Sequence, residues 1–256
     1  MSGCWRLYAV PWYAPFNQLE GMQTMNRNQP ISILLCALGG EGGGVLSEWL
    51  VDIARHAGYA AQATSIPGVA QRTGATTYYL EVFPVPLSEL KGRRPVFGLN
   101  PLPGRLDVLV SSELLETARQ IANGLPSSQH TLILTSSARA LTTLEKMEMG
   151  GGRRQEAGLL QLVREHSRAH HVIDMAALTR TAGTVVSATM LGCIAGSGVL
   201  PFARVDFEAV IGASGSNAAP SLRGFSLGFD AVSQQRAQLR LVEDTLLNSE
   251  LSMHVP

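Results

Sequence analysis

Continuous apolar runs alternate with stretches of helical periodicity along the chain. Residues 31–37 (ISILLCA) form a short apolar run, typical of a strand buried on both faces. Residues 45–57 place their apolar side chains on one helical stripe, and Gly58 stands where a helix C-terminal cap belongs. Further strands are expected at residues 59–66, 75–83, 105–110, 131–135 and 171–175. Further helices are expected at residues 113–122 (with Ser112 as N-cap), 156–168, 177–196, 207–211 and from 229 to about 247.

This alternation predicts βαβ crossovers, and therefore an α/β fold with a doubly wound, mainly parallel, Rossmann-like sheet and helices on both faces. Residues 31–228 are expected to form one domain. Residues 1–30 are an N-terminal extension, expected to be disordered or to reflect a mis-called start, and residues 229–256 form a C-terminal helix or tail. Residues 84–104 are rich in proline and glycine, which predicts a long irregular connection.

Composition narrows the function classes. Lys and Arg total 20 and so do Asp and Glu, which argues against a nucleic-acid partner. No apolar stretch reaches the ~18 residues of a membrane span, so no membrane partner is expected. The cysteines, Cys4, Cys36 and Cys193, are far apart in sequence. This spacing argues against a disulfide framework and against an iron–sulfur or zinc site built by this chain alone, and it favours a cytoplasmic location. Cys36 and Cys193 are interpreted as small buried apolar residues.

A glycine-rich turn follows the first strand and contains Gly39, Gly40, Glu41, Gly42 and Gly43. Such a turn before a helix is where dinucleotide-binding proteins hold a pyrophosphate. No frame of the turn gives G-x-G-x-x-G, and a carboxylate at position 41 would satisfy backbone N–H groups itself and repel phosphate. The acidic residue expected at the end of the second strand is also missing. The alternatives are a tight turn for strand–helix packing, or a loop that presents its backbone to a partner subunit.

A second loop follows the second strand and contains Pro67, Gly68, Gln71, Arg72 and Thr73. In an open α/β sheet it lies at the same edge as the first loop, the edge where such sheets place their sites. The functional interpretation is a binding or partner-facing surface. The structural alternative is that the guanidinium is an ordinary surface charge and the amide a turn residue. Elsewhere, the helical pair His166 and His170 is interpreted as a solvated helix end, and Asp107 and Asp174 as packing or capping residues.

The two loops also carry a family resemblance. The segment from ALGGEGGGVLSEWL through PGVAQRTGATTYYLEV resembles the opening of the gamma domain of 2-oxoacid:ferredoxin oxidoreductases. The similarity continues through RLDVLVSSELLETARQ to TMLGCIAGSGVLPF and SLRGFSLGF, and so covers residues 31–229. The Ala70-Gln71-Arg72 version is most similar to the beta subunit of indolepyruvate oxidoreductase. Three positions depart from the family pattern: Ala37 replaces a turn glycine, Glu41 a glutamine and Ser187 an asparagine.

The resemblance implies a small subunit that supports oxidative decarboxylation of aryl 2-oxo acids to acyl-CoA. Thiamine diphosphate, Mg²⁺ and [4Fe–4S] clusters are then expected on a larger catalytic partner, with no cofactor and no catalytic residue on this chain. Coenzyme A is the co-substrate, and electrons leave to ferredoxin or a similar acceptor through the partner. The chain is expected to be inactive alone. The alternatives are a stand-alone Rossmann-like nucleotide-binding protein or NAD(P)-dependent dehydrogenase, and a non-catalytic interaction module.

Overall fold

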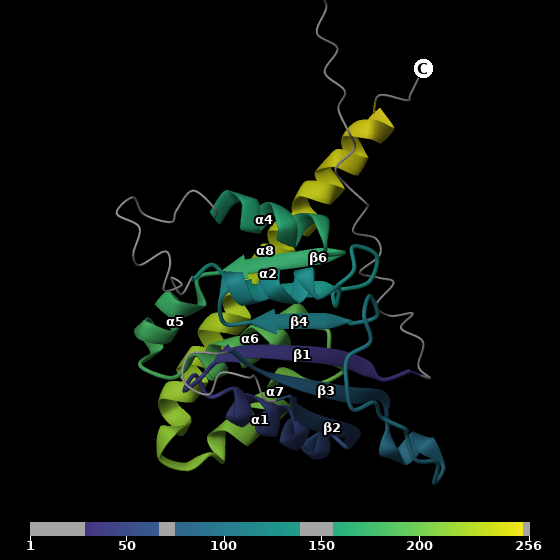
Figure 1. Cartoon of the computed structure of the whole chain (residues 1–256), viewed down its shortest axis with the longest axis vertical. Coiled ribbons are helices and arrows are strands. Elements are labelled where there is room, and N and C mark those ends of the chain that lie inside the picture. The colour runs from purple at the N-terminus through teal and green to yellow at the C-terminus, as the bar shows by residue number, and fades with distance from the viewer. Residues whose placement is uncertain (1–28, 67–74, 139–155, 253–256) are drawn as a thin grey trace, which may run out of the picture.

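A computed structural model describes residues 29–66, 75–138 and 156–252. These residues form a six-stranded sheet in the order β2-β3-β1-β4-β5-β6 (Figure 1). The strands are β1 (Ile31–Leu38), β2 (Tyr59–Ile66), β3 (Ala75–Pro86), β4 (Val108–Ser111), β5 (Leu132–Ser136) and β6 (Ala169–Ile173). The neighbours β1, β4, β5 and β6 are parallel, whereas β3 is antiparallel to both β1 and β2. The prediction of a mainly parallel sheet is confirmed, with β3 as its antiparallel member.

Helices cover both faces of the sheet, as predicted. One buried cluster joins Ile31, Ile33 and Leu35 of β1 to α1, α6, α7 and α8, and the other joins Leu34 and Cys36 to α2 and α4. This alternation follows from the two-residue period of a strand. The helices are α1 (Gly43–His56), α2 (Leu114–Ala122), α4 (Glu156–Glu165), α5 (Met175–Ala182), α6 (Val186–Ser197), α7 (Arg204–Gly212) and α8 (Ala218–Ser252), with 3-10 turns η3 (Leu87–Leu90) and η5 (Gly215–Asn217).

Three predicted helix boundaries are wrong. The single helix expected over 177–196 is two helices, because Gly183 adopts a left-handed conformation (φ 67°) that ends α5. Helix α8 begins at Ala218 rather than after Gly228 and runs as one helix through the expected start of the tail. The N-cap of α2 is Glu113, whose side chain accepts a hydrogen bond from Leu115 N, and not Ser112.

The α6–α8 contact explains why α8 continues through its glycines. A Cβ at Gly192 or Gly228 would overlap a backbone carbonyl oxygen of the facing helix, of Phe225 and Thr189 respectively. A Cβ at Gly196 would lie 2.5 Å from the carbonyl oxygen of Phe229. Glycine therefore lets the two helix backbones approach closely, at positions where a sequence pattern suggests helix breaks.

The irregular connection expected over 84–104 begins later than predicted, because β3 continues to Pro86 and η3 follows it. The part that remains, residues 91–105, crosses the face of β2 and β3 and is called the strap below. Glu81 Oε2 accepts a hydrogen bond from Gly98 N at 2.7 Å, and Thr64 Oγ1 donates one to Leu99 O at 2.8 Å. The strap thus occupies a part of the sheet face that α2 and α4 leave open.

Among the helices that lie in residues 29–66, 75–138 and 156–252, none has both the length and the apolarity that a bilayer crossing requires.

Candidate functional site

The glycine turn folds back onto the end of β1. Glu41 N donates to Leu38 O at 3.1 Å, and the carboxylate of Glu41 accepts from Leu38 N at 2.8 Å. The expectation that Glu41 satisfies a backbone N–H group is correct, but that group belongs to the strand end rather than to the first turn of α1. The carboxylate therefore leaves the N-terminus of α1 without a side-chain cap.

The glycines of this turn are required for two different reasons. Gly40 (φ 88°) and Gly42 (φ 81°) adopt left-handed conformations that other residues rarely take. Gly43 has no room for a side chain, because a Cβ there would lie 2.8 Å from the Tyr78 ring and 3.0 Å from Ala37 Cβ. These contacts support the interpretation of a tight turn for strand–helix packing. The exposed backbone of Gly39 and Gly40 leaves the partner-facing alternative open.

Two helix N-termini meet beside this turn, and neither has a side-chain cap. Gly42 is the N-cap of α1 and Val185 is the N-cap of α6, and neither helix has an acidic residue in its first turn. The two ends are adjacent, since a Cβ at Gly42 would lie 2.8 Å from Ser187 Oγ. Uncapped first-turn amides and the helix dipole together favour an anion at this position.

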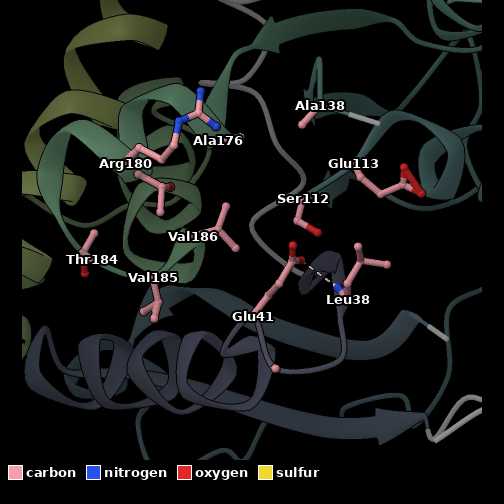
Figure 2. Close-up of a pocket in the computed structure, with 12 residues that line it drawn as sticks. Leu38, Glu41, Ser112, Glu113, Ala138, Ala176, Arg180, Thr184, Val185 and Val186 are labelled. Carbon is pink, nitrogen blue, oxygen red and sulfur yellow. Dashed lines mark hydrogen bonds between the residues drawn. The ribbon is translucent and has the colours of Figure 1, made fainter. Parts of the chain in front are cut away.

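A pocket of about 450 Å³ opens at this place (Figure 2). Leu38 is the last residue of β1, Gly40 and Glu41 belong to the glycine turn, and Ser112 and Glu113 directly follow β4. Facing them in Figure 2 are the side chains of α5 and of the link between α5 and α6. The complete lining comprises Leu38, Gly40, Glu41, Ser112, Glu113, Ala138, Ala176, Thr179, Arg180, Thr184, Val185 and Val186.

The position of the pocket follows from the chain topology. Strands β1 and β4 are parallel neighbours, but α1 packs on one face of the sheet and α2 on the other. The loops after these two strands therefore diverge and leave a crevice at the carboxyl edge, which is where open α/β sheets bind ligands.

The pocket lining combines groups that suit an anionic ligand with two carboxylates, those of Glu41 and Glu113, which repel one. Ser112 is only 5% exposed, and within the described part of the chain its hydroxyl has no hydrogen-bond partner; the same holds for the Ser187 hydroxyl. An unsatisfied buried hydroxyl costs about 1–3 kcal/mol, so a ligand that accepts a hydrogen bond there gains stability. Arg180 supplies an exposed cation at the rim. The carboxylates of Glu41 and Glu113 both accept hydrogen bonds from backbone amides.

Of the residues predicted for the site, the structure places Gly40 and Glu41 in the pocket lining, with Gly42 directly behind them. Pro67, Gly68, Gln71, Arg72 and Thr73 lie outside the described residues. The strand ends that flank them are described: Ile66 pairs with Thr77, and Leu38 pairs with Ala75. Both ends are therefore at the same carboxyl edge as the glycine turn, as predicted.

The sequence did not reveal that Ser112, Arg180, Thr184, Val185 and Val186 belong to the site. Ser112 directly follows β4, so the rule that parallel strands end at one edge was a usable signal for it. Arg180 and the link were hidden by the prediction of one continuous helix. The residue type at Val185 does not indicate that it is the N-cap of α6 or that this helix N-terminus lacks a side-chain cap.

The other candidates have structural roles. Asp174 caps α5 by accepting a hydrogen bond from Ala177 N, and Asp107 accepts one from Ser32 N, so both predictions are confirmed. The interpretation of His166 and His170 as a helical pair is wrong: α4 ends at Glu165, and His170 lies in β6 opposite Ile133, with its Nδ1 3.1 Å from Ser167 Oγ. His166 is exposed just after the end of α4. Within the described ranges, no group of three or more His, Cys, Asp or Glu side chains is placed to hold a metal ion.

The described cysteines are fully buried and free, as predicted. Burial raises the pKa of the Cys193 thiol to about 12 and the pKa of the Cys36 thiol well above its ordinary value. Both thiols are therefore protonated at neutral pH and are unsuited to nucleophilic chemistry.

Residues 32–230 match a family model described as pyruvate ferredoxin/flavodoxin oxidoreductase. No curated protein matches. A subunit of pyruvate oxidoreductase from Thermotoga maritima is similar, with a TM-score of 0.53 and 15% identity over 79% of this chain and 97% of that chain. The gamma subunit of a keto/oxoacid ferredoxin oxidoreductase from Geobacter sulfurreducens gives a TM-score of 0.51 and 13% identity over 80% and 97%.

A third similar structure is larger. The 2-oxoglutarate:ferredoxin oxidoreductase from Magnetococcus marinus, solved with 2-oxoglutarate, coenzyme A and succinyl-CoA bound, gives a TM-score of 0.56 and 12% identity. The similarity covers 81% of this chain but only 31% of that one. At these identities the structures establish a shared fold.

Proposed function

Because the chain belongs to the pyruvate ferredoxin/flavodoxin oxidoreductase family, we propose that it is the small, gamma-type subunit of a 2-oxoacid:ferredoxin oxidoreductase. The observation that carries this proposal is the family match over 32–230, nearly the whole described body. Two similar structures of nearly the same extent are themselves separate subunits of such enzymes. The alternative of a stand-alone dinucleotide-binding protein or dehydrogenase is not favoured by this family membership.

We propose further that the larger partner carries thiamine diphosphate, Mg²⁺ and iron–sulfur clusters, and passes electrons to ferredoxin or a similar acceptor. These groups supply carbanion and one-electron chemistry to the enzyme, while this chain supplies binding and orientation. The thiols of Cys36 and Cys193 are buried and protonated, so neither is suited to bind a cluster as a thiolate. A location in the cytoplasm follows from this role.

For the pocket, we propose that it receives an anionic part of coenzyme A. The uncapped N-terminus of α6, which lies in the pocket lining, offers backbone amides, Ser112 offers an unsatisfied hydroxyl and Arg180 offers a cation. These donors suit a phosphate or a carboxylate that binds beside them and away from the carboxylates of Glu41 and Glu113, which repel an anion. The partner-facing 67–73 loop begins and ends at the same edge, so this edge would lie near the entrance through which coenzyme A reaches the partner.

The substrate class is proposed from the resemblance at Ala70-Gln71-Arg72: aryl 2-oxo acids of the indolepyruvate type. The test is to co-express the chain with a thiamine-binding large subunit and to assay indolepyruvate, pyruvate and a branched 2-oxo acid with coenzyme A and a low-potential acceptor. We expect kcat/KM to be highest for indolepyruvate and activity to require both chains. Preference for pyruvate would overturn the substrate class, and equal activity without this chain would leave only a structural role.

The pocket has its own test. In the assembled enzyme, Arg180→Ala should raise the KM for coenzyme A about tenfold, equivalent to about 1.4 kcal/mol, and leave the KM for the 2-oxo acid unchanged. The matched control is Arg55→Ala, an exposed arginine at the far end of α1. An unchanged KM for coenzyme A would show that the pocket does not bind it. Tight binding of NAD(H) or NADP(H) to the isolated chain would instead favour the dinucleotide alternative.

A further inference from the structure

The strap exposes an unusual amount of apolar surface. The side chains of Val96, Leu99 and Leu102 are 88%, 63% and 68% exposed. Their backbone is fixed by the hydrogen bonds that Glu81 and Thr64 make to Gly98 and Leu99. Three large apolar side chains within seven residues of an ordered connection therefore point away from the sheet, which is typical of an interaction surface rather than of scattered exposure.

The same segment is strongly basic. Lys91, Arg93, Arg94 and Arg105 are all exposed, and residues 91–106 contain no aspartate or glutamate. Over the whole chain, by contrast, 20 basic residues balance 20 acidic ones. An apolar centre with a charged rim is the usual composition of a protein–protein interface, and a rim of one sign selects a partner surface of the opposite sign.

The position of the strap adds a third argument. It begins after β3 and ends just before β4, both at the amino-terminal edge of the parallel strands and opposite the pocket, and between these ends it crosses β3 and β2 as far as Thr64 (Figure 1). It also covers a sheet face over which α2 and α4 do not extend. A partner bound to the strap would cover the part of this sheet face that α2 and α4 leave open, and it would not obstruct the pocket.

We infer that the strap is the surface on which this chain docks to the large catalytic subunit, against a patch of that subunit that is apolar at its centre and acidic at its rim. This inference rests on the proposed function, since it takes the partner from it. Aliphatic side chains favour a protein partner over a nucleic acid, which is bound through phosphate contacts and base stacking.

The experiment compares three versions of the full chain binding to the purified large subunit. The first carries Val96→Ser, Leu99→Ser and Leu102→Ser, and the second carries Arg93→Glu and Arg94→Glu. The control carries Leu241→Ser and Val242→Ser, which replace exposed apolar residues of α8 (69% and 49% exposed) far from the strap. Thermal unfolding of each chain serves as the check on folding, and all three should unfold at the temperature of the unmodified chain.

We expect the apolar variant to weaken the Kd at least tenfold through faster dissociation. The charge-reversal variant should slow association and flatten its dependence on salt, because electrostatic steering acts on the association rate. The control should bind like the unmodified chain. A carbodiimide reagent should also cross-link Lys91 directly to a carboxylate of the large subunit, which tests the acidic rim independently.

The outcomes separate the two proposals. If the unmodified chain forms no complex with the large subunit, the proposed function fails and takes this inference with it. If the complex forms and both strap variants bind normally, only the docking surface is wrong, and the same holds if the α8 control loses binding instead. Strap-dependent binding to duplex DNA or to phosphatidylserine vesicles, tighter than binding to the subunit, would also overturn the inference.

Discussion

The glycine turn after β1 and the glycine stripe between α6 and α8 use the same residue type for different physical reasons. In the turn, Gly40 and Gly42 have positive φ, so glycine is needed for its backbone conformation. In the stripe, Gly192 and Gly228 have ordinary helical backbone, and glycine is needed because a facing backbone leaves no space. The number of glycines therefore does not locate a functional site. What distinguishes the turn from the stripe is whether glycine is needed for its backbone conformation or for the space that a side chain would occupy.

The largest effect is expected in the stripe. Gly192→Ala places a Cβ onto the carbonyl oxygen of Phe225, so the helices must separate and the buried cluster between them loosens. We expect a loss of about 3 kcal/mol in the free energy of unfolding, measured by urea denaturation. The control is Gly158→Ala in α4, where a Cβ meets nothing within 4 Å. It should stabilise the chain by about 0.5–1 kcal/mol, and equal losses in both variants would remove the distinction.

A smaller loss, about 2 kcal/mol, is expected for Gly42→Ala, since it combines left-handed strain with a Cβ 2.8 Å from Ser187 Oγ. A double-mutant cycle with Ser187→Ala separates the two parts. Removing the hydroxyl should recover the steric part and leave the conformational part. Strictly additive losses in the cycle would show that the contact with Ser187 is not the source of strain.

Gly40→Ala isolates the conformational part by itself. Its φ is 88° and a Cβ there meets nothing within 4 Å, so only backbone strain opposes the substitution. We expect a loss of about 1 kcal/mol, again from urea denaturation. A loss as large as that of Gly42→Ala would mean that the turn is constrained by contacts rather than by its backbone angles.

The smallest effect on stability is expected for Ser112→Ala, and it should have the opposite sign. The buried hydroxyl has no partner within the described ranges, so its removal should stabilise the chain by up to about 1 kcal/mol. The same variant should weaken coenzyme A binding to the assembled enzyme, measured by calorimetry. A destabilised variant with unchanged coenzyme A affinity would show that this hydroxyl is structural.

Much of the fold was predictable because the strands are buried on both faces. Strands β1 and β5 were recognisable as continuous apolar runs, and α1 was recognisable from an apolar stripe with the helical period. The direction of β3 was not predictable, because its β-branched and aromatic composition is the same for either direction. The start of α8 was hidden by Pro220 and the stripe glycines, which break helices unless they lie in a first turn or against another backbone.

The site was predictable only in part, because one side of the pocket depends on where two helices end and begin. Glycine turns at strand ends can be found from sequence, so the Gly40–Glu41 side of the pocket was expected. The opposite side depends on where α5 ends and α6 begins, and therefore on the single left-handed residue Gly183. Whether a helix N-terminus has a side-chain cap depends on which backbone amide a nearby carboxylate accepts from. Glu41 accepts from Leu38 at the strand end, whereas Glu113 accepts from Leu115 in α2, and sequence spacing alone does not determine either choice.

Helix α8 has a consequence for how this chain behaves in solution. Its last turns extend well past the sheet and the helices packed against it (Figure 1). A particle with such a protruding rod diffuses more slowly than a sphere of equal mass, so gel filtration against globular standards would overstate the molecular weight of a single copy. Subunit stoichiometry should therefore be taken from sedimentation equilibrium or light scattering, whose results do not depend on particle shape.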